Sequence, residues 1–242
     1  MSKKLTYKQF GERAILIEWE AKIDEEILTD ITSFRDKIQN TLKDKIQDCI
    51  VGYHSLTIVY KDFINFSSEE KSLKKLYTEE SVTRKSKSFL WQIPVCYDVQ
   101  FGIDLEEISR QSKLSIEEII QLHTKTICTV YFIGFLPGFL YLGGLDEQLH
   151  FPRKSNPRLQ VTKGSVAIGG SQTGVYPQES AGGWNIIGNT PINFFNIEKE
   201  HPCFAKSGDI IQFVSVSLDQ YKAIQNQIEK GVYKLSKTVL ND

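Results

Sequence analysis

The stretch Val161–Pro191 decides the fold, and it reads V-T-K-G-S-V-A-I-G-G-S-Q-T-G-V-Y-P-Q-E-S-A-G-G-W-N-I-I-G-N-T-P. Seven of its residues are glycines, while the whole 242-residue chain has 16. Glycine serves positions where the backbone turns at positive φ or approaches another group closely. The apolar runs between these glycines predict short buried strands that are joined by tight turns.

Polar and aromatic side chains lie among these glycines. They are Ser171, Gln172, Thr173, Tyr176, Trp184 and Asn185. One interpretation is a binding site, in which the turns of a sheet present donors, acceptors and stacking surfaces to a bound molecule. The other is a scaffold, because Gly-rich turns between short strands occur in any β-barrel. The residues alone leave both interpretations open.

Outward from this stretch, the chain divides into two parts. From Thr126 onward, short apolar runs alternate with turn signals, which favours a barrel or a sandwich. Helix-start patterns at Asp104 and Ser115 precede that region, and a last helix is expected over Leu218–Lys230, ending at Gly231. The polar run Thr78–Ser88 predicts a linker. We therefore expect domains at residues 1–88 and 89–242.

The first part predicts a small unit of mixed strands and helices. Arg13–Trp19, Cys49–Tyr53 and Leu56–Tyr60 are expected strands. Asp24 is expected to cap a helix whose apolar positions recur every three or four residues as far as Ile46, and Ser67 is expected to cap a second helix. The fold class is therefore α+β, with an antiparallel sheet and helices on one of its faces.

Composition excludes several function classes. The chain has 29 Lys and Arg against 30 Asp and Glu, so no basic excess points to nucleic acid. No run of about 18 apolar residues predicts a membrane span, and the first ten residues lack a secretory signal, which predicts a cytoplasmic protein. The four cysteines lack the spacing of a zinc site and no histidine pair has the H-x-x-x-H pattern, so no metal site is expected. The patterns of a P-loop and of a Rossmann dinucleotide site are also missing.

Two further segments hold candidate functional residues. His123 shares a helical face with Ile119 and Ile120, and is either a core histidine or a proton-transfer group. Leu136-Pro137-Gly138 predicts a type II turn. The aromatic residues around that turn, Phe135, Phe139 and Tyr141, are either packing residues or the wall of a pocket. Arg153 and Arg158 are either solvated charges or ligands of a carboxylate or phosphate.

Four motifs together resemble the KipI family, which is also described as the B subunit of bacterial 5-oxoprolinase and as allophanate hydrolase subunit 1. They are G-F-L-P-G-F-L-Y-L at Gly134–Leu142, N-P-R at Asn156–Arg158, G-S-V-A-I-G-G-S-Q-T-G-V-Y-P at Gly164–Pro177 and G-G-W-N-I-I-G-N-T-P at Gly182–Pro191. The segments Phe10–Trp19, Gly52–Tyr60 and Ile93–Ile108 fit the same family. The resemblance runs from about Tyr7 to Val216.

The resemblance implies a small N-terminal α/β domain and a C-terminal cyclophilin-like β-barrel. It implies a 5-oxoprolinase complex with two partners, a KipA-like C subunit and an A subunit, which opens the ring of 5-oxo-L-proline to give L-glutamate with ATP as co-substrate. Two alternatives stay open. One is a KipI-like inhibitor of a sensor histidine kinase, and the other is a component of an enzyme that acts on allophanate or a similar urea-derived amide.

The residue types then predict the site. We expect His123, Gln172 and Thr173 as catalytic groups. We expect substrate or nucleotide to contact Pro137, Arg158, Gly170, Ser171, Tyr176, Trp184 and Asn189. Backbone amides of the segment from Gly169 to Gly174 are expected to face developing negative charge. Asn189 stands where the family usually has Arg, which removes an expected contact to an anion, and Ala181 stands where the family usually has Pro.

Overall fold

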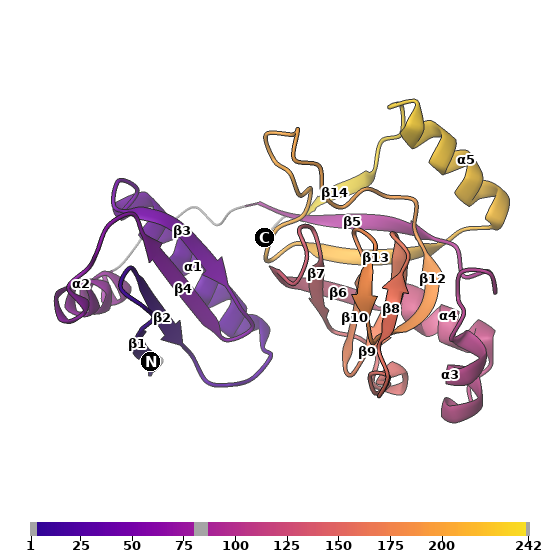
Figure 1. The fold of residues 1–242 in the computed structure, drawn as a ribbon, viewed down its shortest axis with the longest axis horizontal. Helices are drawn as coiled ribbons and strands as arrows, with labels where there is room; N and C mark the ends of the chain where they lie inside the picture. The colour runs from indigo at the N-terminus through magenta and orange to yellow at the C-terminus, as the bar shows by residue number, and fades with distance from the viewer. Residues whose placement is uncertain (1–3, 80–86, 241–242) are drawn as a thin grey trace. The chain divides into compact units, whose positions relative to one another are not determined.

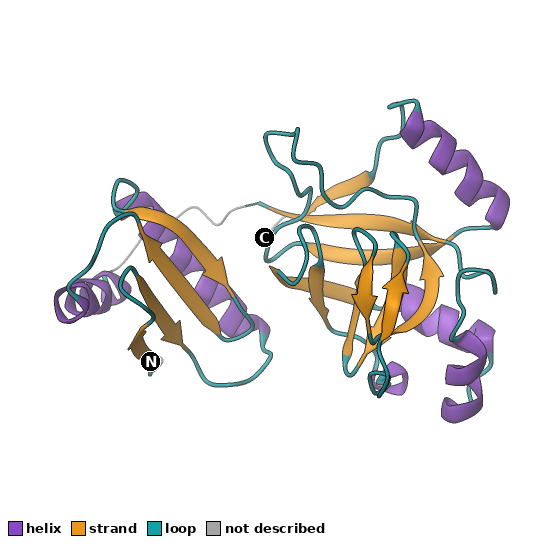
Figure 2. Ribbon diagram, viewed as in Figure 1, coloured by secondary structure: helices purple, strands orange, loops and turns teal. Residues whose placement is uncertain are grey.

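The computed structural model describes residues 4–79 and 87–240, and the polar residues 80–86 of the expected linker lie outside them. The chain divides into two compact units, Met1–Ser86 and Lys87–Asp242, called here the N-terminal and C-terminal units. Helices and strands mix in both, and strands dominate the C-terminal unit (Figure 2). The class is therefore mixed α and β with mostly sheet.

The N-terminal unit is an antiparallel sheet packed against a long helix (Figure 1). Its elements are β1 (Thr6–Gln9), β2 (Ala14–Glu18), α1 (Glu25–Thr41), β3 (Ile46–Val51), β4 (Ser55–Tyr60) and α2 (Phe66–Thr78). The strand order is β1-β2-β4-β3. Asp24 caps α1 as predicted, since its carboxylate accepts hydrogen bonds from the amides of Glu26 and Ile27.

Two details of this unit differ from the predictions. Helix α1 ends at Thr41 rather than near Ile46, because Ile46 pairs with Tyr60 as the first residue of β3. Helix α2 is capped by Asn65 rather than Ser67, since the Asn65 side chain accepts from the amide of Ser68. Periodicity and composition did not distinguish these neighbouring alternatives, and the cross-strand pairing and the local hydrogen bond decide them.

The C-terminal unit is built on one large sheet with the order β12-β9-β10-β7-β6-β13-β5-β14. Its strands are β5 (Ser88–Val95), β6 (Ile127–Ile133), β7 (Leu140–Gly143), β9 (Ser165–Gly169), β10 (Gln172–Val175), β12 (Asn185–Asn189), β13 (Ile210–Ser215) and β14 (Ser236–Leu240). Among the described pairs of this sheet, only β13 and β5 run parallel. Strand β14 has no signature in the sequence, because it pairs with β5 through exposed residues without an apolar pattern.

Further elements surround this sheet (Figure 1). They are α3 (Leu105–Ser112), α4 (Ile116–Lys125), the 3-10 helix η1 (Glu147–Leu149), α5 (Leu218–Glu229) and a two-stranded sheet of β8 (Arg158–Val161) and β11 (Ser180–Gly182). Helix α4 begins with the predicted capping box of Ser115 and Glu118. Past the end of α5, Gly231 has φ of +70°, in agreement with the predicted helix end.

The large sheet curls so that its first strand meets the residue that follows β5. Cys96 and Asn189 exchange two backbone hydrogen bonds, with N–O distances of 2.8 and 2.9 Å. One face of the sheet packs against α3 and α4 around residues such as Val130, Ile168 and Phe213. The other face holds a smaller apolar cluster beneath β8 and β11. The sheet therefore has an inner and an outer core, and a side chain on a strand belongs to one or the other.

Candidate functional site

An aromatic cleft of about 320 Å³ opens on the outer side of the large sheet. Its lining consists of five aromatic residues, two basic residues, a proline and three small residues at the end of β11: Phe135, Phe139, Tyr141, Tyr176, Trp184, Arg153, Lys154, Pro157, Ala181, Gly182 and Gly183. Mostly apolar clefts with a few polar groups are typical of small-molecule sites. This aromatic cleft is therefore the candidate functional site.

Phe139, Tyr176 and Trp184 form the floor of the cleft. The Phe139 ring meets Tyr176 and Trp184 edge to face, with centroids 5.6 and 5.5 Å apart. Trp184 lies so close to Gly169 that an added Cβ would stand 2.6 Å from its ring atoms. The glycine therefore allows an indole ring to lie directly on the strand. At this position the scaffold interpretation of the Gly-rich stretch is supported.

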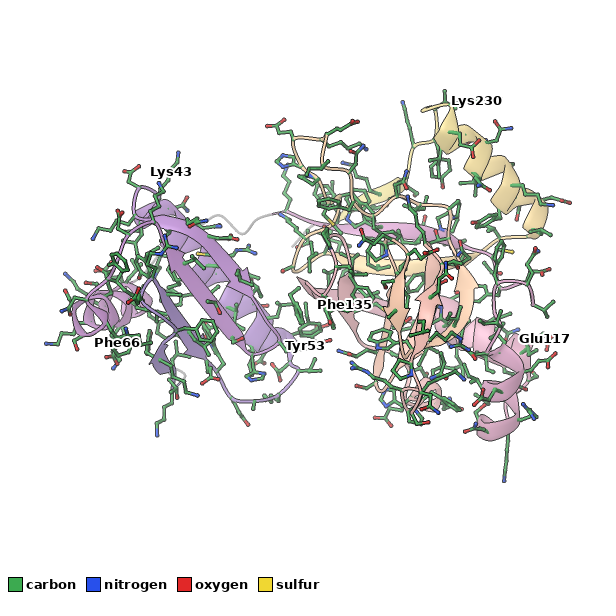
Figure 3. All side chains as sticks on the ribbon, viewed as in Figure 1. Lys43, Tyr53, Phe66, Glu117, Phe135 and Lys230 are labelled. Atoms are coloured by element: carbon green, nitrogen blue, oxygen red, sulfur yellow. The ribbon has the colours of Figure 1, made fainter. Side chains whose placement is uncertain are left out.

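The loop between β6 and β7 forms one wall of the cleft. The Phe139 amide donates to the Leu136 carbonyl at 2.9 Å and Gly138 has φ of +84°, so the predicted type II turn is confirmed. Phe135 precedes it at φ of +63°, and the Leu136 amide donates to Gly134 across it at 2.7 Å, as in a γ-turn. This conformation is strained for a residue other than glycine. It presents Phe135, labelled in Figure 3, with 63% of its surface exposed.

Three cations lie at or beside the cleft, and two of them are neutralised. Asp104, which is 2% exposed, accepts from Arg158 at 2.6 Å and from Lys154 at 3.0 Å. Lys154 also pairs with Glu107 at 2.8 Å. The other Asp104 oxygen accepts from the Ile186 amide at 2.7 Å. The Asp104 carboxylate thus holds the segment of Lys154 to Arg158 onto β12. Helix α3 starts after Asp104 as predicted, but this carboxylate makes no capping hydrogen bond.

Arg153 is the third cation. Its guanidinium lies over the Trp184 ring, 5.5 Å from the centroid, and its side chain is exposed. Burial raises the pKa of Tyr176, while the Trp184 amide and the Arg153 and Arg158 guanidinium groups act in the opposite direction. Burial is the larger effect, so the Tyr176 hydroxyl has a raised pKa and stays protonated at physiological pH.

The predicted catalytic residues His123 and Thr173 contact each other in the inner core, and both are completely buried. Thr173 Oγ1 donates to the Ala167 carbonyl at 3.1 Å and accepts from His123 Nε2 at 2.8 Å. His123 Nδ1 then accepts from the Tyr97 hydroxyl at 2.6 Å. Burial lowers the pKa of His123 to about 3, so the ring is neutral at physiological pH. Both ring nitrogens are occupied, as in a core histidine.

The inner and outer groups lie on opposite faces of β10. Thr173 and Val175 face the inner core, whereas Gly174 approaches Trp184 and Phe139 and Tyr176 belongs to the outer cluster. His123 and Thr173 are thus separated from the aromatic cleft by the sheet itself. A proton-transfer role for His123 stays a prediction that this geometry does not favour.

Some of the residues that were predicted to bind ligand lie at the cleft, and others lie away from it. Tyr176 and Trp184 line the cleft, and Pro137 lies in the adjoining turn. Gly170 and Ser171 form the exposed turn between β9 and β10, and the Gly170 amide donates to Phe151 at 2.7 Å. That amide is therefore not free for a developing negative charge.

Three other residues that were expected to bind ligand or to catalyse lie outside the cleft, with structural partners or in buried positions. Asn189 donates to the Lys163 carbonyl at 3.0 Å and accepts from the Tyr221 hydroxyl at 2.8 Å, so it attaches α5 to β12. Arg158 pairs with Asp104. Gln172 is buried in β10, and alternation along the strand assigns it to the face of Gly174. The structure thus does not bring these three side chains into the cleft lining.

Sequence reasoning missed Lys154 and Tyr97. Lys154 directly follows Arg153 in F-P-R-K, and two adjacent cations next to a proline were a usable signal. No local pattern pointed to Tyr97, whose partner is 26 residues away. In residues 4–79 and 87–240, no group of three or more His, Cys, Asp and Glu side chains is arranged to hold a metal ion. Across those same ranges, no helix has both the length and the apolar character needed to cross a membrane.

The chain belongs to the family described as carboxyltransferase domain, subdomains C and D, whose model matches residues 5–205. It is 34% identical to the 5-oxoprolinase B subunit of Bacillus subtilis, over 94% of this chain and 99% of that protein. It is 40% identical to the 5-oxoprolinase B subunit of Haemophilus influenzae, over 70% of this chain and 79% of that protein.

A solved structure shares the fold. The urea carboxylase of Kluyveromyces lactis superposes with a TM-score of 0.78 at 20% identity. The match covers 99% of this chain but only 24% of the urea carboxylase, so this chain corresponds to one part of that much larger protein. At this level of identity the likeness concerns the fold alone.

Proposed function

We propose that this chain is the B subunit of an ATP-dependent 5-oxoprolinase, a hydrolase that converts 5-oxo-L-proline to L-glutamate. The observation that carries the proposal is the end-to-end match to the 5-oxoprolinase B subunit of Bacillus subtilis, 34% identical over 94% of this chain and 99% of the relative. The chain acts in the cytoplasm, in a complex with an A subunit and a KipA-like C subunit. Alone it has little or no activity.

ATP enters this proposal as a co-substrate of the complex. A lactam carbonyl is a poor electrophile, and phosphorylation of its oxygen would activate it. Within this chain the turn at Gly170 is poorly suited to a phosphate, because the Gly170 amide already donates to Phe151. Arg158 is likewise held by Asp104. We therefore assign this chain the binding and orientation of the small substrate at the aromatic cleft.

The same proposal extends to the architecture. The two hydrogen bonds between Cys96 and Asn189 support a closed, cyclophilin-like barrel, because they join the strand at one edge of the large sheet to the segment after β5. The barrel domain comprises residues 89–242 and the α/β domain residues 1–88. His123 and Thr173 then act as positioning residues that fix β10 from inside the barrel, while Gln172 stays a candidate on its outer face.

Reconstitution tests this function. This chain and its two purified partner subunits are mixed with 5-oxoproline and ATP, and L-glutamate and ADP are measured. We expect both products from the complete mixture and a loss of glutamate when this chain is omitted. No glutamate from the complete mixture would reject the proposal. A panel with allophanate and related urea-derived amides identifies the alternative substrate class.

A matched pair of variants links activity to the cleft. Phe135→Ala removes an exposed aromatic wall of the cleft, and Leu159→Ala removes a side chain that is 93% exposed on β8 and does not line it. We expect the first to reduce 5-oxoproline turnover at least about tenfold, since it loses apolar contact with the substrate. The second should keep the wild-type rate. Equal turnover rates for both variants would show that the activity does not depend on the cleft.

A further inference from the structure

We propose that Arg153 is the residue that binds the carboxylate of the substrate in the aromatic cleft. This deepens the proposed function and rests on it. The charges around the cleft single out this residue. Of the three cations there, Arg158 and Lys154 are paired with Asp104, and Lys154 also with Glu107. Within the described parts of the chain, no carboxylate lies within ion-pair distance of Arg153.

The position of Arg153 leaves its donors available. The guanidinium lies over the face of Trp184, 5.5 Å from the ring centroid. This attraction acts between the charge of the cation and the face of the ring, so it does not use up the five N–H donors of the guanidinium. A carboxylate approaching the edge of the guanidinium accepts two parallel hydrogen bonds. Trp184, which is 6% exposed and seated on Gly169, is a rigid support for the cation.

The rest of the cleft lining suits the apolar part of a ligand whose carboxylate binds Arg153. Phe135 presents an exposed ring and Tyr141 a half-buried one, and the cleft of about 320 Å³ has the size of a small-molecule site. A small ring that bears one carboxylate satisfies both features, with its ring carbons on the aromatic lining and its anion at Arg153. 5-Oxoproline has this chemistry.

Phe135 adds a reason to regard the cleft as built for a ligand. The residue is held at φ of +63° by the turn from Gly134 to Leu136, yet most of its side chain is exposed. Strained backbone at an exposed aromatic side chain has no evident benefit for folding, and such strain is concentrated at binding sites. The strained turn keeps the ring at the edge of the cleft, in edge-to-face contact with Phe139 at 5.6 Å.

The test measures substrate affinity in the assembled complex with Arg153→Gln, Arg153→Lys and the control Arg110→Gln. Arg110 is exposed on α3 and does not line the cleft. We expect Arg153→Gln to raise the KM for 5-oxoproline about ten- to a hundredfold, the loss of a charge-assisted hydrogen-bond pair, with kcat changed less than about threefold. Arg153→Lys should lie between wild type and Arg153→Gln, since it keeps the charge but loses the fork.

A carboxylate-free analogue completes the test. 2-Pyrrolidone has the lactam ring without the carboxylate, so it should inhibit the wild-type and Arg153→Gln complexes equally. An unchanged KM in Arg153→Gln, in a complex that does make glutamate, would overturn the role of Arg153 and leave the proposed function standing. A fall in kcat or in the yield of assembled complex without a change in KM would also overturn it, and would indicate that the cleft contacts a partner protein. Absence of glutamate from the wild-type complex rejects the proposed function itself and, with it, this inference.

Discussion

Stability of the C-terminal unit should depend on pH through His123. The pKa of the buried ring is lowered from 6.5 to about 3, while the unfolded chain keeps the ordinary value. As pH falls below 6.5, the unfolded state takes up a proton that the folded state does not, so the free energy of unfolding decreases. The slope is about 1.4 kcal/mol per pH unit, which gives a loss of about 2 to 3 kcal/mol between pH 7.5 and pH 4.5.

Urea unfolding at several pH values measures this loss. Fluorescence of Trp91 and Trp184, in a Trp19→Phe background, reports on the C-terminal unit alone. His123→Gln removes the titrating ring. Between pH 7.5 and pH 4.5, the free energy of unfolding of this variant should therefore fall less than that of the parent, and the difference should be about 2 to 3 kcal/mol. His201→Gln, at an exposed position, should match the parent slope. Equal losses of unfolding free energy in His123→Gln and the parent would refute the assignment of the pH dependence to this ring.

Three further changes test local packing, ion pairing and helix capping in the C-terminal unit. Gly169→Ala should lower the free energy of unfolding by about 1 to 3 kcal/mol, because the new Cβ meets the Trp184 ring at 2.6 Å, whereas Gly183→Ala, with no neighbour closer than 3.5 Å, should be nearly neutral in the same urea titration. Asp104→Asn should lower the free energy of unfolding by about 3 kcal/mol, because Arg158 and Lys154 both lose their buried counter-charge. Scanning calorimetry should show this loss as a lower Tm, and the double variant with Glu107→Gln should not regain the Tm of the wild type. Ser115→Ala removes the cap of α4 and should cost about 1 kcal/mol, visible as faster hydrogen exchange in the first turn; an unchanged exchange rate would contradict the capping geometry.

Local signals in the sequence were sufficient for much of the fold. The cap at Asp24, the capping box at Ser115 and the turn at Pro137 and Gly138 each depend on contacts within four residues, and each was predicted. The end of α1 and the presence of β14 depend instead on pairing with distant strands, which no local pattern encodes. Asp104 shows the same limit, because its partner Arg158 is 54 residues away.

The residue types of the candidate site could be predicted from the sequence, but the face of the sheet on which each side chain lies could not. Tyr176 and Trp184 were recognised as ligand-binding candidates, and they lie in the cleft. Thr173 and His123 have polar side chains like those of the cleft candidates, yet alternation along β10 directs Thr173 inward, where it contacts His123. Which face of a strand borders the cleft depends on the segments that cover the sheet, here the β6–β7 loop, residues 153–157 and β11, and no local pattern encodes their placement.

Hydrogen–deuterium exchange of the assembled complex, with and without 5-oxoproline, tests most directly the claim that ligand binds at the aromatic cleft. We expect new protection at the backbone amides of residues 135, 136, 138 and 139 and of residues 182–184, and none at the turn of Gly170 and Ser171. Protection confined to that turn, or a complex that binds 5-oxoproline without any change around the cleft, would contradict the claim.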